Sequence, residues 1–293
     1  MNWDDVRIFL AVARAGQILA ASRRLGLNHA TVGRRLDTLE RALGTPLFAR
    51  RPSGCELTRE GAAFLAPAER IEAEMAAAAG LAAGTDAAIA GTVRIGAPDG
   101  FGTAFLAPRL AGLTDRHPGI RVQLVPVPRA FSISRREADI AITVERPAEG
   151  RLVARKLVTY ALGLYAARGY LAEHGTPSGV GDLTRHRLVG AVEDLLYSPS
   201  LHYTAEIADD WQSRFEISSA LGQTEAVAAG AGIGILHAFI ADRRSELVRV
   251  LPAHEIRREY WLVIHESARG LAPIRAAADF IAETVEAERG LFG

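Results

Sequence analysis

Hydrophobic positions in the first sixty residues recur every three or four places, which predicts three short helices over residues 3–15, 18–25 and 29–43. Each predicted helix is followed by a glycine, a residue that ends helices readily because it adopts a left-handed backbone without strain. The second and third helices are separated by a glycine-containing turn of about three residues. Two helices joined in this way are typical of a helix-turn-helix motif.

The third predicted helix has one apolar and one polar face. Asn28 is a suitable N-cap, and Arg34 lies on the polar face with Gly33 and Arg35 at its flanks. The apolar stripe consists of Val32, Leu36, Leu39 and Leu43. Such a stripe packs the helix against the two before it and leaves the arginine-bearing face outward.

Residues 47–57 predict a β-hairpin. Apolar pairs at 47–48 and 56–57 flank Arg50, Arg51 and a Pro-Ser-Gly turn. Three short helices followed by a two-stranded hairpin make residues 1–60 a predicted winged helix-turn-helix domain, an all-α fold apart from its wing.

Residues 61–90 are expected to form a long linker helix, capped by Thr58 and interrupted by Pro67, where we expect a kink. Its larger apolar residues step by alternating intervals of four and three, which is a heptad seam. The seam residues are Phe64, Ala68, Ile71, Met75, Ala78 and Ala82. The pattern favours pairing with a second copy of the chain, and packing within one chain remains the alternative.

From residue 91 onward short strands alternate with helices, which indicates an α/β fold with a largely parallel sheet. The predicted strands cover residues 92–96, 122–127, 139–144, 161–165 and 235–239. About 200 residues suit two lobes with a cleft between them. We expect one lobe at 91–160 plus 265–293 and the other at 161–264.

Composition narrows the class of protein. Of the 293 residues 49% are hydrophobic and 23% charged, so a sizeable core is expected and wholesale disorder is not. No stretch reaches the ~20 apolar residues of a membrane helix. The N-terminus lacks a secretory signal, and a single cysteine, Cys55, fits a reducing cytoplasm. We expect a cytoplasmic protein that does not contact membranes.

Charge is distributed unevenly along a chain whose formal net charge is zero. Residues 1–60 hold ten arginines and six acidic residues, a net charge of +4, so the remaining chain carries −4. A basic N-terminal block on an acidic body is expected of a nucleic-acid-binding module attached to another domain.

Several sequence segments occur together in a characteristic order. Residues 20–32 read AASRRLGLNHATV, and Leu-Gly at 43–44 and Leu-Phe-x-Arg at 47–50 follow. Ala-Asp-Ile-Ala at 138–141 and Gly-x-Gly-Ile-Gly at 230–234 come later in the chain. With this combination the chain resembles the LysR-type transcriptional regulators nearly from end to end. The resemblance implies a two-lobed body like that of periplasmic binding proteins, a small-molecule effector, and homodimers or tetramers.

The resemblance places double-stranded DNA on the third helix and the hairpin. Thr31, Arg34 and Arg35 are the candidates for the major groove, and the hairpin residues suit phosphates or the minor groove. The full candidate set is Asn28, His29, Ala30, Thr31, Gly33, Arg34, Arg35, Arg50, Arg51 and Ser53. The family usually has serine where this chain has Gly33, and often glutamine where it has His29, so the operator sequence stays open.

A small-molecule effector is expected where strands meet helix N-termini in the cleft. Backbone N–H groups at Thr103 and Thr224 are candidates for holding a carboxylate, although nearby acids leave a polar or cationic effector open. The candidate set is Pro98, Asp99, Gly100, Phe101, Thr103, Val144, Glu145, Val192, Glu193, Asp194, Gln223 and Thr224.

Other classes of protein are less well supported. The glycines at 230, 232 and 234 follow a predicted helix and precede a strand, the reverse of a phosphate-binding loop. No nucleophile elbow and no paired metal-ligand spacing occur, so we expect neither an enzyme nor a metal or other cofactor. The alternative is a solute-binding module whose basic N-terminal domain contacts another protein.

Overall fold

A computed structural model describes residues 2–51, 54–82, 89–130, 133, 137–147 and 150–293. In the linker helix the side chains of residues 66, 70, 73–74 and 76–82 lie outside that description. The chain divides into two compact units, the first of which comprises Met1–Ile89. The second comprises Ala90–Arg269 and Pro273–Gly293, and each unit is described by itself.

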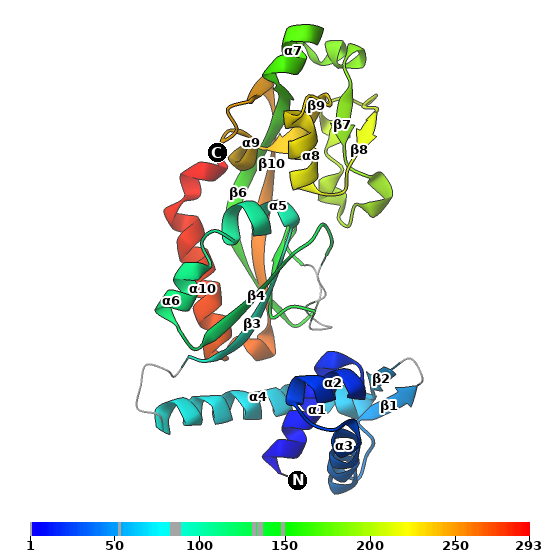
Figure 1. The fold of residues 1–293 in the computed structure, drawn as a ribbon, viewed down its shortest axis with the longest axis vertical. Coiled ribbons are helices and arrows are strands. Elements are labelled where there is room, and N and C mark those ends of the chain that lie inside the picture. Colours follow the sequence, from blue (N-terminus) through cyan, green and yellow to red (C-terminus); the bar gives the residue numbers. More distant parts are fainter. Residues whose placement is uncertain (1, 52–53, 83–88, 131–132, 134–136, 148–149) are drawn as a thin grey trace. The chain divides into compact units, whose positions relative to one another are not determined.

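The first unit is a winged helix-turn-helix followed by a long helix (Figure 1). Its elements are α1 Trp3–Ala15, α2 Ile18–Leu25, α3 His29–Leu43, β1 Phe48–Arg51, β2 Gly54–Leu57 and α4 Arg59–Ala82. The three predicted short helices and the hairpin are therefore confirmed. The predicted stops are confirmed too, because Gly16, Gly26 and Gly44 adopt left-handed φ angles of 68°, 64° and 69°.

The core of the first unit lies between α1, α3 and the start of α4. Val32, Leu36 and Leu39 of the apolar stripe are fully buried, together with Phe9 of α1. Phe9 contacts Phe48 of β1, with ring centroids 5.3 Å apart, so the wing shares this core. The burial of one face of α3 leaves its other face outward.

The second unit is built, within the described residues, on an eight-stranded sheet of order β4-β3-β5-β10-β6-β9-β7-β8. Its strands are β3 Gly91–Ala97, β4 Ile120–Pro126, β5 Ile140–Thr143, β6 Leu152–Ala167, β7 Leu188–Gly190, β8 Phe215–Glu216, β9 Ile233–His237 and β10 Leu247–His265. Its helices are α5 Asp99–Phe101, α6 Ala111–Arg116, α7 Arg168–His174, α8 Ala220–Ala228, α9 Ala238–Ala241 and α10 Ala272–Ala287.

The α/β fold is confirmed, but the prediction of a largely parallel sheet is wrong. β6 and β10 are long antiparallel partners that run side by side through both lobes, and β9 is also antiparallel to β6 (Figure 1). Only the flanking pairs, β3 with β4 and β5 and β7 with β8 and β9, are parallel. The sheet is mixed because two shared strands cross between lobes whose outer strands are each wound in parallel.

The strand β10 was missing from the prediction, and it moves the lobe boundary. Residues 261–264 of β10 already pair with β5, so the boundary expected at 265 lies too late in the chain. The register between β10 and β6 shifts between Val250 and Glu255 and again between Tyr260 and Trp261. Leu251, inside the first irregularity, has a φ of 47°. These irregularities interrupt the alternation of apolar and polar residues by which a strand is recognised in a sequence.

The first lobe contains β3, β4, β5 and α10, and the second contains β7, β8, β9 and α8 (Figure 1). Aromatic rings fill the region beside the crossing strands. Phe101 lies 4.5 Å from Tyr260 and 6.1 Å from Phe292, measured between ring centroids. Within the described chain, no helix is long and apolar enough to cross a membrane.

Candidate functional site

The N-terminus of α3 is exposed and well capped. The side-chain Oδ1 of Asn28 accepts a hydrogen bond of 2.9 Å from the backbone N–H of Ala30, which satisfies a free donor of the first turn. His29 and Ala30 are exposed, and Thr31 is half-buried. Since the dipole of α3 makes this end positive, the first turn is suited to approach an anion.

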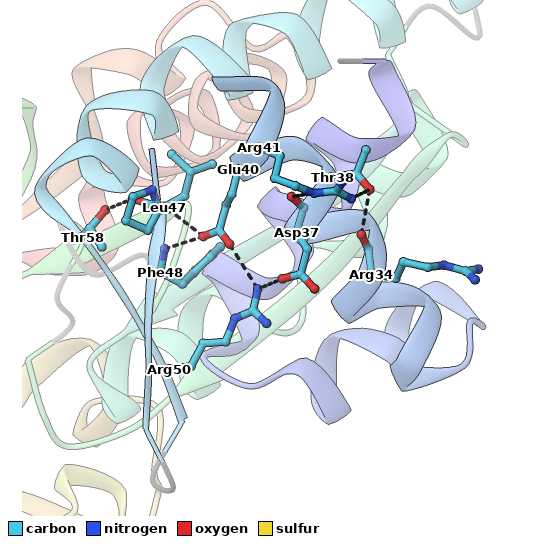
Figure 2. Close-up of polar contacts among 10 residues, drawn as sticks. Arg34, Asp37, Thr38, Glu40, Arg41, Leu47, Phe48, Arg50 and Thr58 are labelled. Atoms are coloured by element: carbon cyan, nitrogen blue, oxygen red, sulfur yellow. Dashed lines mark hydrogen bonds and ion pairs between the residues drawn. The ribbon is translucent and has the colours of Figure 1, made fainter. Parts of the chain in front are cut away.

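Arg34 is the free cation of the outer face of α3. Its backbone carbonyl accepts a 2.9 Å hydrogen bond from the Thr38 hydroxyl, but its guanidinium has no partner among the described residues. Figure 2 shows the Arg34 side chain extending away from the ion pairs of the wing. Gly33, beside it, has nothing within 4 Å of the position of a Cβ atom. This part of the helix is therefore open to an external partner.

Arg50, predicted as a DNA contact, is exposed but forms ion pairs within the domain. Its guanidinium pairs with Asp37 of α3 and lies 3.2 Å from Glu40 Oε2 (Figure 2). Partial burial disfavours the charge, but the hydrogen bond and charge of Asp37 together with Glu40 raise the pKa of Arg50. Arg50 therefore ties the wing to α3.

Glu40 completes the same connection through its other oxygen. Oε1 accepts hydrogen bonds from the backbone N–H groups of Leu47, at 2.7 Å, and Phe48, at 3.1 Å (Figure 2). One carboxylate thus receives two main-chain donors at the start of β1 and one guanidinium from its end. The wing and α3 are fixed to each other, so they present one continuous surface.

The remaining arginines of the domain divide into paired and free groups. Arg35 lies 3.4 Å from Asp4 and 3.5 Å from Asp5 of α1, so it stabilises helix packing. Arg51 is 64% exposed and only loosely paired, with Glu56 at 3.7 Å. Ser53 lies outside the described residues.

Two further exposed arginines were not among the predicted contacts. Arg23 and Arg24 end α2, and within the described chain neither forms an ion pair or a hydrogen bond through its side chain. The sequence signal that could have identified them is a pair of basic residues shortly before the glycine-containing turn. Together with Arg34 and Arg51 they make the helix-turn-helix surface positive, as a polyanion partner requires.

The predicted seam of α4 splits into two parts. Phe64 packs edge-on against Phe9, with centroids 5.1 Å apart, and Ala68 is fully buried in the same core. Ile71 and Met75, one and two turns further, are 37% and 45% exposed. The side chains of Ala78 and Ala82 lie outside the described ones. Only the second part of the seam is available to a partner.

A cavity of about 50 Å³ lies between the two lobes of the second unit. Half of the predicted effector residues line it, namely Pro98, Asp99, Gly100, Val144, Val192 and Gln223. The other half do not, namely Phe101, Thr103, Glu145, Glu193, Asp194 and Thr224. Phe101 is buried in the aromatic core, and Thr103 is exposed.

Hydrogen bonds join the lobes on both sides of this cavity. Asp99 Oδ2 accepts a 2.6 Å hydrogen bond from the Ser219 hydroxyl and a 3.3 Å bond from the backbone N–H of Leu221. Glu145 Oε1 accepts from the Ser198 hydroxyl at 2.5 Å and from the Ser200 N–H at 3.0 Å. The Ser198 hydrogen bond lowers the pKa of Glu145. The lobes are therefore held together by two carboxylates.

The carboxylate site expected at Thr103 and Thr224 is wrong in its position. α5 begins at Asp99 and α8 at Ala220, so both threonines come after the first turn, where N–H groups are already bonded. The Thr224 hydroxyl donates to the Ala220 carbonyl at 2.9 Å, inside the helix. The free N-terminus of α8 instead faces Asp99.

The floor of the cavity is a stack of rings that the sequence did not reveal. Tyr160 of β6 lies between Tyr260 of β10 and His237 of β9, with centroid distances of 4.1 Å and 5.3 Å. Burial lowers the pKa of His237 to about 4 and raises the pKa values of both tyrosines. These three side chains come from strands far apart in sequence, so no local motif marks them.

A second cavity, of about 270 Å³, lies in the second lobe beside the first. The two share a wall that includes Tyr203 and Gln223. Glu193, expected at the cleft, lines this cavity together with Glu216 and Trp211. The second lobe therefore offers more room than the gap between the lobes.

A helix-turn-helix with a free basic face, joined to a two-lobed unit with an internal cleft, defines a DNA-binding regulator with a ligand-binding domain. Residues 3–62 match the bacterial regulatory helix-turn-helix proteins of the lysR family, and residues 86–286 match the LysR substrate binding domain. The chain therefore belongs to the LysR-type transcriptional regulators.

Proteins of similar sequence or structure are also transcriptional regulators. The regulator CrgA of Neisseria meningitidis serogroup C is 27% identical over 86% of this chain and 84% of its own. The Mau operon transcriptional activator of Paracoccus denitrificans is 28% identical, covering 97% and 98%. The solved structure of CrgA from Neisseria meningitidis covers 97% of this chain and 99% of that one, with 26% identity and a TM-score of 0.61.

Proposed function

We propose that the chain binds an operator in double-stranded DNA through the outer face of α3, with the wing and the end of α2 on the flanking phosphates. The observation that carries this proposal is the free Arg34 guanidinium on the exposed face of a helix whose other face is buried. An arginine so placed pairs with guanine O6 and N7 in the major groove. Operator binding requires a cytoplasmic protein and needs no catalytic residues.

A homodimer formed through the outer part of α4 completes the proposal, with a tetramer as the larger assembly. Ile71 and Met75 are large apolar side chains that the single chain leaves exposed. A symmetric dimer binds a partly palindromic operator whose half-sites are about one helical turn apart, or a multiple of that.

The cleft of the second unit is the proposed effector site. Ligand binding there acts on the two carboxylates whose hydrogen bonds join the lobes, Asp99 and Glu145, because opening of the lobes would break those bonds. A ligand that prefers one arrangement shifts the population toward it, and the shift passes to DNA binding within the oligomer.

The test is a titration of labelled DNA from the region upstream of its own gene, followed by fluorescence anisotropy at several salt concentrations. Affinity should fall steeply between ~50 and 200 mM salt, because phosphate contacts release counterions. Arg34→Ala should weaken specific binding by about 1–3 kcal/mol and relax preference at one base.

Arg275→Ala removes an equal charge from an exposed position of α10 and serves as the matched control. Equal effects of the two substitutions would contradict the role of Arg34. Absence of DNA binding at low salt would instead favour a solute-binding module with a basic protein-interaction domain.

A further inference from the structure

The linings of the two cavities carry negative but no permanent positive charge. Their described residues include the carboxylates of Asp99, Glu193 and Glu216. They include no lysine or arginine, although the chain has 34 such residues. An anionic ligand would therefore meet carboxylates without a counter-ion.

Among the described elements of the cleft, the N-terminus of α8 is the one that attracts anions, and it is already occupied. α8 has nine residues and its N-terminus carries a partial positive charge, but Asp99 Oδ2 accepts from Ser219 and Leu221 there. A ligand carboxylate would have to displace that of Asp99 and remain next to it. Like charges in such proximity repel strongly in a partly dehydrated site.

Two buried hydroxyl groups of the cleft have no partner outside their own pair. The hydroxyls of Tyr160 and Tyr260 find a hydrogen-bond partner only in each other among the described residues, and the residues are 1% and 0% exposed. Both line the cavity. A single bond between the two hydroxyls leaves lone pairs of both oxygens unused, so a ligand that supplies hydrogen-bond donors there binds favourably.

The negative charge of Asp99 also affects the pKa values of aromatic side chains in the cleft. Burial first, and then the negative charge of Asp99, raise the pKa of Tyr197. Burial and the neighbouring Tyr160 and Tyr197 raise the pKa of Tyr260, and Asp99 adds a smaller contribution in the same direction. Asp99 also opposes the effect of burial on the pKa of His237.

The second oxygen of Asp99, Oδ1, accepts no hydrogen bond from any described residue. The cleft therefore combines a carboxylate oxygen without a hydrogen bond, neutral phenols and a described lining without lysine or arginine. The charge of Arg258 acts on Tyr160 and Tyr203 from outside that lining.

We propose that the effector cleft selects a small protonated amine, whose ammonium group lies at Asp99 Oδ1 and donates to the hydroxyls of Tyr160 and Tyr260. This inference rests on the proposed function of the cleft as the effector site. An ammonium donates three hydrogen bonds and accepts none, which matches one carboxylate oxygen and two phenols. The apolar part of the ligand extends along the shared wall toward the larger cavity.

Isothermal titration calorimetry on the full-length protein at neutral pH tests the inference. The probes are n-propylamine and benzylamine, each compared with the alcohol and the carboxylate of matching skeleton: propan-1-ol and propionate, benzyl alcohol and benzoate. At least one amine should bind ten times more tightly than its carboxylate counterpart. Asp99→Asn should weaken amine binding at least tenfold while keeping an acceptor for Ser219.

Asp210→Asn makes the same chemical change at an exposed position outside both cavities, and amine affinity should stay within twofold. The inference is overturned if a carboxylate binds as tightly as its amine, if no amine binds, or if Asp99→Asn leaves amine binding unchanged. DNA binding is measured on the same preparations. Operator binding together with a carboxylate preference contradicts this inference alone, whereas amine binding without DNA binding contradicts the proposed function.

Discussion

The rings of Tyr160 and His237 lie nearly parallel, with an interplanar angle of 11° and centroids 5.3 Å apart. The imidazole is buried, and no carboxylate bonds to it in the described structure, so burial lowers its pKa to about 4. A neutral histidine in this place makes the stability of the second unit depend on pH.

Stability should fall as the solution becomes acidic. In the unfolded chain His237 titrates near its ordinary pKa of about 6.5, whereas in the folded chain it stays neutral down to about pH 4. Its contribution is complete above pH 6.5 and is lost as the pH falls toward 4. Between pH 7 and pH 5 the loss is about 2 kcal/mol.

Urea denaturation of the parent protein and of His237→Phe at both pH values measures this difference. The phenylalanine variant should lack the histidine part of the pH dependence, and exposed His29→Asn should keep it. A pH slope that is equal in the parent and His237→Phe would contradict the buried neutral state.

Two helical glycines of the first unit should respond in opposite ways to substitution by alanine. At Gly33 the added methyl meets nothing within 4 Å, so Gly33→Ala should stabilise the domain by about 0.5–1 kcal/mol. At Gly61 the methyl would lie 2.0 Å from the Leu47 carbonyl oxygen, so Gly61→Ala should destabilise it by about 1–3 kcal/mol. Thermal unfolding compares the two, and a stabilising Gly61→Ala would show that α4 does not press on β1.

The connection between wing and α3 predicts unequal effects of its two partners. Arg50→Ala removes partly exposed ion pairs, which should cost about 0.2–1 kcal/mol. Glu40→Ala also leaves the N–H groups of Leu47 and Phe48 without acceptors, which should cost about 1–3 kcal/mol. Denaturant titration of both variants measures the order, and a larger loss from Arg50→Ala would contradict it.

The exposed part of the α4 seam predicts the effect of charge on self-association. Met75→Glu should weaken dimerisation at least tenfold, because it would bury a carboxylate in an apolar contact. Sedimentation equilibrium gives the dissociation constant. Leu195→Glu alters another exposed apolar residue, in the second unit, and is the control. Dimers of unchanged strength in Met75→Glu would place the interface elsewhere.

Local signals in the sequence predicted the bounds of the three short helices of the first unit, whereas the linker helix expected at 61–90 spans Arg59–Ala82. The ends of α1, α2 and α3 follow from caps and left-handed glycines that act within one turn. The role of Arg50 did not follow, although Arg50 belongs to the Leu-Phe-x-Arg segment at 47–50. The pairing of Arg50 with Glu40 requires the wing to fold back on α3, and no periodicity encodes that contact.

The sequence predicted only part of the cleft, because the remaining residues meet through contacts between distant segments. Asp99 and Val144 were found because they lie at or just after the ends of predicted strands, which is a local rule. Tyr160, Tyr260 and His237 meet only when β6, β10 and β9 pair, and β10 was hidden by its bulges. The expected anion site at Thr224 lies inside α8, whose N-cap is Ser219.

Because β6 and β10 belong to both lobes, neither lobe possesses a complete set of strands of its own. Calorimetry of the second unit should therefore give one melting transition instead of two. Any opening of the cleft must bend the hydrogen-bonded pair β6 and β10 at its bulges. Because that pair resists bending, the lobes can move apart in only a few ways.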